Sequence, residues 1–220
     1  MCFSATASFS AAVGIGGIGA LTIWKTARSG HARALPFAAI PLVFAAQQAI
    51  EGFLWLEIVK PVAGAYRPIL IHGFIGYVEI FWPAYAPLAA FLIEPVGKRR
   101  RMILACLVCG AILSAWFFSV MIDYPYRAYL HEDGIVYKNA HHSPWFITPL
   151  YALTTTVSFS LSSYREVRIF SLVLFIGLAA AAIFYNRAYV SVWCFFAGVA
   201  STLVYLHVSR IQDYSRHRVQ

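Results

Sequence analysis

Apolar residues form long runs along the whole chain, and only short polar segments separate one run from the next. Runs of about 20 apolar residues without strict alternation are typical of transmembrane helices, which satisfy their own backbone hydrogen bonds in lipid. The pattern predicts an all-α, polytopic membrane protein with seven transmembrane helices. We place them at Phe9–Thr26, Leu35–Val59, Pro68–Ile93, Met102–Ile122, Trp145–Ser162, Ile169–Tyr185 and Val190–Val208.

The composition supports the same class, since 60% of the 220 residues are hydrophobic, 12% are charged and the mean hydropathy is +0.69. A soluble chain of this length exposes far more charge. No polar segment is long enough for a second domain, so residues 1–220 are expected to form a single membrane domain. The longest loop, residues 123–144, is expected on the outer side and is long enough to cap a pocket between the helices.

Lysine and arginine residues divide unequally between the two ends of the predicted helices. Twelve fall at one end and five at the other, so the positive-inside rule places the N-terminus outside and the C-terminus in the cytoplasm. The net charge of +8 has the same origin and does not indicate a nucleic-acid partner. Residues 1–8 contain no lysine or arginine, so we expect the first helix to be retained rather than cleaved as a signal peptide.

Several short motifs have simpler explanations than their usual chemistry. Gly14–Gly19 matches G-x-G-x-x-G, but it lies inside the first predicted helix and favours close helix packing over dinucleotide binding. Cys106 and Cys109 lie on consecutive turns of a helix, where small buried residues are expected. Aromatic residues near helix ends, Tyr126 and Trp193 among them, are expected in interfacial belts. A retinal Schiff base is excluded, because the lysines lie only at helix ends or in loops: Lys25, Lys60, Lys98 and Lys138.

Polar residues also occur inside the predicted helices, mainly in the second and third. Gln47, Gln48 and Glu51 share one helix face, and with a rise of about 1.5 Å per residue His72 of the antiparallel third helix comes to the depth of Glu51. Glu79 comes to the depth of the two glutamines. These residues predict an outward-facing polar pocket lined by Gln47, Gln48, Glu51, His72, Glu79, Tyr151 and Cys194.

An ionised carboxylate at this depth costs several kcal/mol unless it is paired or solvated. Glu51 and Glu79 are therefore expected to be protonated, paired with His72, bound to a cation or in contact with a hydrated cavity. Three functions remain open: a pocket that binds a small ligand or metal ion from the outer side, a membrane-embedded metal-dependent hydrolase, and a structural subunit of a membrane complex whose polar core is merely satisfied.

A metal site would use Glu51 and His72 as ligands of a divalent ion such as zinc or copper. No H-E-x-x-H or equivalent spacing links the candidate ligands, so such a site would have to assemble across helices and the outer loop. His141 and His142 of that loop are more simply interpreted as solvated.

Three segments resemble an uncharacterised family of bacterial seven-helix membrane proteins. They are M-C-F-S-A-T-A-S-F at residues 1–9, Gln48-x-x-Glu51-Gly52-x-x-Trp55, and Ser191-x-Trp193-Cys194-Phe195-Phe196-Ala197. The resemblance implies the seven-helix fold and a bacterial inner membrane, and it implies no activity. Gln47 stands where the family pattern leads us to expect histidine, which weakens a metal site there. If Met1 is removed, Cys2 could fold over the mouth of the pocket and add a soft metal ligand or a thiol.

Overall fold

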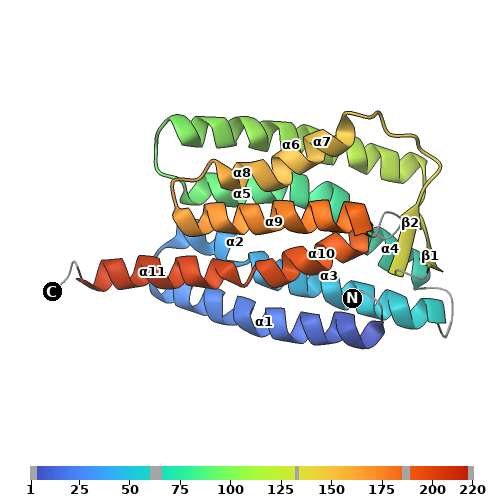
Figure 1. The fold of residues 1–220 in the computed structure, drawn as a ribbon, viewed down its shortest axis with the longest axis horizontal. Coiled ribbons are helices and arrows are strands. Elements are labelled where there is room, and N and C mark those ends of the chain that lie inside the picture. Colours follow the sequence, from blue (N-terminus) through green and yellow to red (C-terminus); the bar gives the residue numbers. More distant parts are fainter. Residues whose placement is uncertain (1–3, 60–65, 132–133, 185–188, 218–220) are drawn as a thin grey trace.

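The computed structural model describes residues 4–59, 66–131, 134–184 and 189–217, and its long helices lie roughly along one axis (Figure 1). Six helical stretches in this part of the chain are long and apolar enough to cross a membrane. Their bounds are Ala5–Arg28, Ala32–Val59, Arg67–Ile93, Lys98–Asp123, Arg165–Phe184 and Val190–Arg210.

Three of these six stretches contain breaks. The first, fourth and fifth are the single helices α1 (Ala5–Arg28), α6 (Lys98–Asp123) and α9 (Arg165–Phe184). The second stretch contains η1 (Ala32–Ala34), α2 (Leu35–Ala38) and α3 (Ile40–Val59). The third contains α4 (Arg67–Ile75), η2 (Gly76–Phe81) and α5 (Trp82–Ile93). The sixth covers α10 (Tyr189–Ala200) from its second residue on and the start of α11 (Leu203–His217).

The predicted transmembrane helix at Trp145–Ser162 corresponds to a short, divided helical run in the structure. It consists of α7 (Ile147–Ala152), η3 (Leu153–Val157) and α8 (Ser158–Ser160), which contact α5, α6 and α9. This run is shorter than each of the six stretches above. The polytopic helical class is therefore supported, and the count of seven transmembrane helices stays a prediction.

Small residues let α1 and α3 approach closely. A Cβ atom placed on Gly19 would lie 2.6 Å from the backbone nitrogen of Leu42, and one placed on Gly16 would lie 3.3 Å from the Cβ atom of Ala45. The interpretation of Gly14–Gly19 as a packing motif is confirmed at these two positions. A still closer approach joins α5 and α6, where a Cβ atom on Gly110 would lie 1.8 Å from the carbonyl oxygen of Pro83.

Two π-helical turns, η2 and η3, interrupt neighbouring helices. Pro83 is the second residue after η2 and has no backbone N–H, so it cannot make the α-helical bond to the residue four positions earlier. The N–H of Trp82 donates instead to the carbonyl of Tyr77, as a π-helical turn requires. The hydroxyl of Tyr151, just before η3, donates to the carbonyl oxygen of Val78 in η2 at 2.9 Å. The two irregular turns are thus connected.

The structure contains a β-hairpin that the all-α prediction missed. Strands β1 (Arg127–His131) and β2 (Gly134–Lys138) pair antiparallel, and Gly134 has a φ of 140° that favours glycine at the turn. Ala128 and Ile135 pack in a cluster with residues of α3 and α4. The strand sequences R-A-Y-L-H and G-I-V-Y-K do not alternate strictly between apolar and polar residues, so their pattern indicated no strand.

Further contacts fix the hairpin to α4. The ring of Tyr137 stacks on Phe74, with centroids 4.7 Å apart and an interplanar angle of 9°. The guanidinium of Arg67 donates to the carbonyl oxygen of Ala128 at 2.5 Å. Residues 123–144 therefore form an ordered element against the bundle in their described part.

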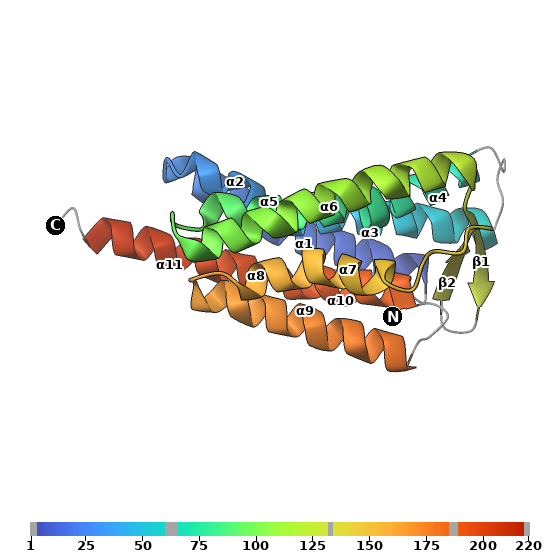
Figure 2. The same ribbon diagram turned by 90° about the horizontal axis from the view of Figure 1, so that it is seen from above.

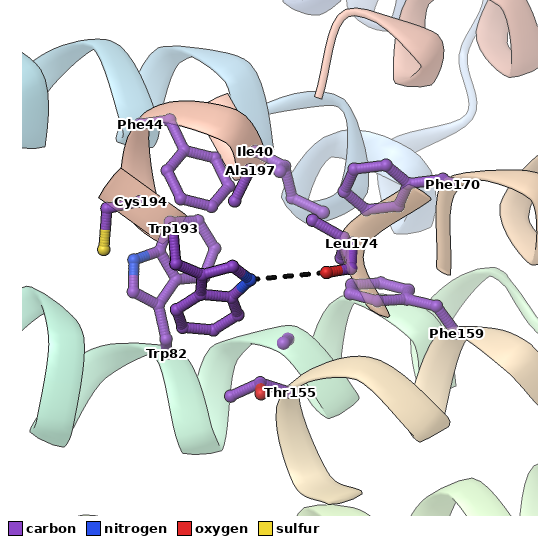
Figure 3. Close-up of a pocket in the computed structure, with 11 residues that line it drawn as sticks. Ile40, Phe44, Trp82, Thr155, Phe159, Phe170, Leu174, Trp193, Cys194 and Ala197 are labelled. Carbon is purple, nitrogen blue, oxygen red and sulfur yellow. Dashed lines mark hydrogen bonds between the residues drawn. The ribbon is translucent and has the colours of Figure 1, made fainter. Parts of the chain in front are cut away.

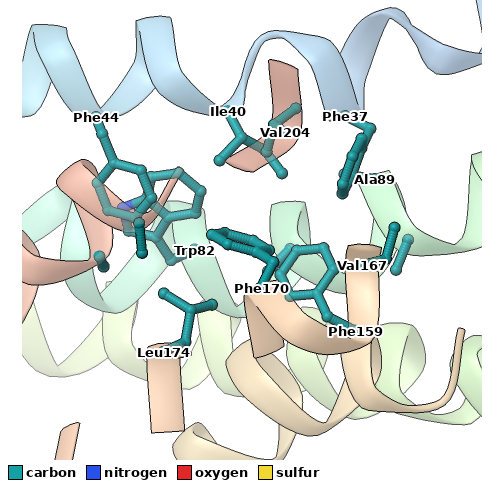
Figure 4. Packing of buried hydrophobic residues seen from close by; sticks show 14 of the residues in the cluster. Phe37, Ile40, Phe44, Trp82, Ala89, Phe159, Val167, Phe170, Leu174 and Val204 are labelled. Carbon is teal, nitrogen blue, oxygen red and sulfur yellow. The ribbon is translucent and has the colours of Figure 1, made fainter. Parts of the chain in front are cut away.

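The largest apolar cluster fills the bundle between α2, α3, α5, α8 and α9 (Figure 4). Phe44 stacks on Trp82 at 4.1 Å between ring centroids, and Phe159 contacts the rings of Phe37 and Phe170 at 6.0 and 5.2 Å.

The two ends of the bundle carry different residues, as Figure 2 shows. The hairpin and the start of α1 lie at one end, which we call the hairpin end. The end of α1 and the starts of α6 and α9 lie at the other, the basic end, with Lys25, Arg28, Lys98–Arg101 and Arg165. This segregation matches the two groups of basic residues behind the predicted orientation.

Candidate functional site

The structure divides the predicted pocket residues into two groups. Gln47, Gln48, Glu51 and Cys194 are buried together with Ser191, and we call these five residues the buried polar cluster. Glu79 and Tyr151 line a separate cavity nearer the surface. His72 belongs to neither group.

Hydrogen bonds hold the buried polar cluster together across helices. Glu51 of α3 accepts a hydrogen bond from the Ser191 hydroxyl of α10 and one of 3.4 Å from the Gln48 amide. The Gln47 amide oxygen accepts from the indole N–H of Trp82 at 2.7 Å. Gln47, Gln48 and Glu51 are each 0% exposed. The polar face of the second predicted helix is therefore directed into the protein and not toward lipid.

The start of α1 also packs against this region. A Cβ atom on Gly52 would lie 2.9 Å from the ring of Phe9, and Ser8 is 0% exposed. With the bond from Ser191 to Glu51, these contacts bring together parts of all three segments that carry the family resemblance. Cys2 lies outside the described residues, so its predicted place at the pocket mouth stays a prediction.

One cavity lined by the described residues adjoins the buried polar cluster at Cys194. The adjoining cavity has a volume of about 20 Å³ and is lined mainly by apolar residues, with Cys194 and Trp193 on one side (Figure 3). A cavity of this size holds about one water. In the described part of the chain, the amide nitrogen of Gln47 and the hydroxyl of Ser8 have no hydrogen-bond partner. The cluster thus acts as an interhelical contact, and one of these two unsatisfied atoms, the Gln47 amide nitrogen, belongs to it.

The predicted pairing of His72 with Glu51 is not among the contacts of the described residues. The Nδ1 atom of His72 lies 2.7 Å from the carbonyl oxygen of Pro68, within its own helix, while Glu51 bonds to α3 and α10. The same residues contain no group of three or more His, Cys, Asp or Glu side chains that could hold a metal ion. The metal ligands predicted at Glu51 and His72 therefore have no geometric support.

Glu79 lies where two cavities meet near the hairpin end. The hydroxyl of Tyr126, just before β1, donates to its carboxylate at 2.7 Å from each oxygen. One cavity, of about 140 Å³, extends from Glu79 toward α6, α7 and α10. The other, of about 270 Å³, is bounded by the hairpin and the residues after it, among them Tyr137, Lys138, Asn139 and His141. We call the two cavities together the Glu79 cleft.

Three aromatic rings form one wall of the smaller cavity. Tyr151 contacts Trp193 and Phe117 edge to face, with ring centroids 5.8 and 6.3 Å apart. The bond from the Tyr151 hydroxyl to Val78 fixes this wall to the turn that carries Glu79. α6, α7 and α10 therefore each supply one ring, and the π-helical turn supplies the carboxylate.

A family model matches residues 1–218 of the chain. The chain belongs to this family of unknown function, DUF6629. No curated protein and no solved structure matches the chain.

The match to DUF6629 covers both the buried polar cluster and the Glu79 cleft. Of the cleft, sequence reasoning identified Glu79 and Tyr151 but missed Tyr126 and Trp193, which it assigned to interfacial belts. Tyr126 reaches Glu79 because the hairpin folds back over α4, and only a predicted hairpin could have indicated that contact.

Proposed function

We propose that this member of DUF6629 is a multi-pass protein of the bacterial inner membrane that binds a small ligand in the Glu79 cleft, taken from the outer side. The observation behind the proposal is a single carboxylate at the junction of two cavities near the hairpin end. Ligand sites are usually concave, mostly apolar and equipped with a few converging polar groups. An ionisable residue inside a transmembrane helix is also a functional candidate by default.

The rest of the molecule supports the choice of this cleft. Among the cavities lined by described residues, the one beside the buried polar cluster has a volume of about 20 Å³, and the large apolar cluster packs next to it. Under this proposal the hairpin, which is tied to α4 by Arg67 and by the stacking of Tyr137 on Phe74, would act as the cap for which residues 123–144 are long enough. Among the described residues, no contact favours the alternative function of a metal-dependent hydrolase.

Filling the smaller cavity tests ligand binding. Ala152 lines this cavity, and its replacement by phenylalanine should occupy the space, whereas Ala111→Phe adds the same ring on an exposed part of α6. A panel of small ammonium, guanidinium, carboxylate and polyol compounds is added to each detergent-solubilised protein, and thermal unfolding is measured. At least one class should raise the melting temperature of the wild type and of Ala111→Phe but not of Ala152→Phe.

The proposal would be contradicted if no compound in the panel raised the melting temperature of the wild type and of Ala111→Phe without also raising that of Ala152→Phe. The melting temperature of each variant without compound shows whether the variant itself folds.

Labelling of introduced cysteines tests the outward direction of the cleft. Thr148 lines the smaller cavity and is exposed, and Val96, 89% exposed, lies between α5 and the basic start of α6. In intact spheroplasts a membrane-impermeant maleimide should label Thr148→Cys above the wild-type background. Val96→Cys should react only after lysis. The reverse pattern would place the cleft on the cytoplasmic side and refute the orientation.

A further inference from the structure

The smaller cavity of the Glu79 cleft has one charged group and several aromatic ones. Among the described residues that line it, Glu79 alone carries a formal charge, and Phe117, Tyr151 and Trp193 supply rings. The other polar side chains on its surface are those of Ser143 and Thr148. The cavity therefore offers a negative charge and aromatic surface to whatever enters it.

These groups favour a cation over other ligands. A carboxylate in a mostly apolar cavity attracts a positive charge more strongly than it would in water, and the negative faces of aromatic rings add a cation–π attraction. An anion would be repelled by Glu79. A polyol would need many hydrogen-bonding partners, yet the Tyr151 hydroxyl already donates to the carbonyl of Val78.

The volume limits the size of the ligand. A cavity of about 140 Å³ is several times the roughly 10–15 Å³ of such space that one water needs, so it can hold several waters. A compact group of a few non-hydrogen atoms fits this space. Lys138 lines the larger cavity and not the smaller one, and its side chain is exposed with the ammonium 5.9 Å from the ring centroid of Tyr129. Solvent screens its repulsion of a second cation.

We propose that the ligand of the Glu79 cleft is a small organic ammonium, whose charged group pairs with Glu79 and contacts the rings of Tyr151 and Trp193. This inference rests on the proposed function, because it names the chemical class bound at the same site. A bare metal ion is a poorer occupant, since Glu79 is the one carboxylate among the described residues that line this cavity, and three aromatic side chains stand where further oxygen ligands would be needed.

A matched pair of probes tests the charge requirement on the unmodified protein. Choline and 3,3-dimethylbutan-1-ol have the same shape, but only choline carries the ammonium charge. Calorimetric titration of the detergent-solubilised protein should detect choline binding and at least about a 10-fold weaker interaction with the neutral alcohol, the ratio expected for a charge-assisted contact.

Variants of the protein locate the effect. Glu79→Gln should weaken choline binding by about 10-fold or more and leave the weak interaction of the alcohol unchanged. Glu79→Asp, which keeps the charge, should retain more of the affinity than Glu79→Gln, and Ala111→Phe should bind choline like the wild type.

The outcomes separate this inference from the proposed function. Equal binding of choline and the alcohol, or choline binding that is unaffected in Glu79→Gln, would overturn the ammonium assignment. A compound of another class that binds the wild type but not Ala152→Phe would also overturn it while leaving the proposed function in place. Failure of every compound in the panel would overturn both.

Discussion

Replacing Gly110 by alanine is expected to destabilise the helix bundle strongly. The added Cβ atom would lie 1.8 Å from the carbonyl oxygen and 2.7 Å from the carbonyl carbon of Pro83, both of which belong to the backbone. Backbone atoms cannot rotate away as a flexible side chain can, so α5 and α6 must separate. Overpacking of this kind costs about 1–3 kcal/mol and sometimes more. The measurement is thermal or denaturant unfolding in detergent.

Gly14 and Gly17 supply the matched control for this substitution. An added Cβ atom at either position meets nothing within 4 Å. Alanine is favoured over glycine inside a helix by about 1 kcal/mol, so Gly14→Ala and Gly17→Ala should leave stability unchanged or raise it. If Gly110→Ala unfolded at the same temperature as these controls, the close contact of α5 with α6 would be refuted.

Glu51→Ala is expected to lower the free energy of unfolding by about 2–4 kcal/mol. The Ser191 hydroxyl and the Gln48 amide would lose their common acceptor in a fully buried site, and the missing side chain would leave a cavity. Because Ser191 lies on α10 and Glu51 on α3, the substitution also removes a polar link between these helices. Chemical unfolding of the purified protein measures the loss.

Glu51→Gln is the conservative partner of this substitution. Its amide oxygen can still accept the bond from Ser191, so we expect a smaller loss than for Glu51→Ala. Equal stability of Glu51→Ala and the wild type would show that the buried polar cluster contributes nothing to the fold. Choline binding should persist in Glu51→Gln, since the cluster lies outside the lining of the Glu79 cleft.

The apolar runs predicted most of the helical architecture, because burial in lipid imposes length and hydrophobicity on each segment. The depth of Glu51 was also informative, since the residue is buried among polar partners. However, the depth of a residue in the membrane does not determine how its helix is rotated about its own axis relative to a neighbouring helix. His72 was placed at the same depth as Glu51, yet it bonds within its own helix, and Glu51 accepts bonds from Ser191 and Gln48.

The Glu79 cleft was only partly predictable for a related reason. Its carboxylate and Tyr151 follow from polar positions in apolar segments, but the hydroxyl that bonds Glu79 comes from Tyr126 in the outer loop. That contact depends on a hairpin of two short strands. The π-helical turn at residues 76–81 adds a second difficulty, because it rotates the residues after it away from the regular α-helical positions on which the predicted faces were based.

The attachment of the hairpin to α4 determines how a ligand can be exchanged under the proposed function. Because the hairpin is hydrogen-bonded to α4 through Arg67 and stacked on it through Tyr137, it need not move away from α4 each time a ligand binds. The ligand would instead enter and leave the larger cavity past Lys138, Asn139 and His141, which line it. An entrance of fixed width would exclude molecules by their size first, and the Glu79 carboxylate would then select among the remaining ones by charge.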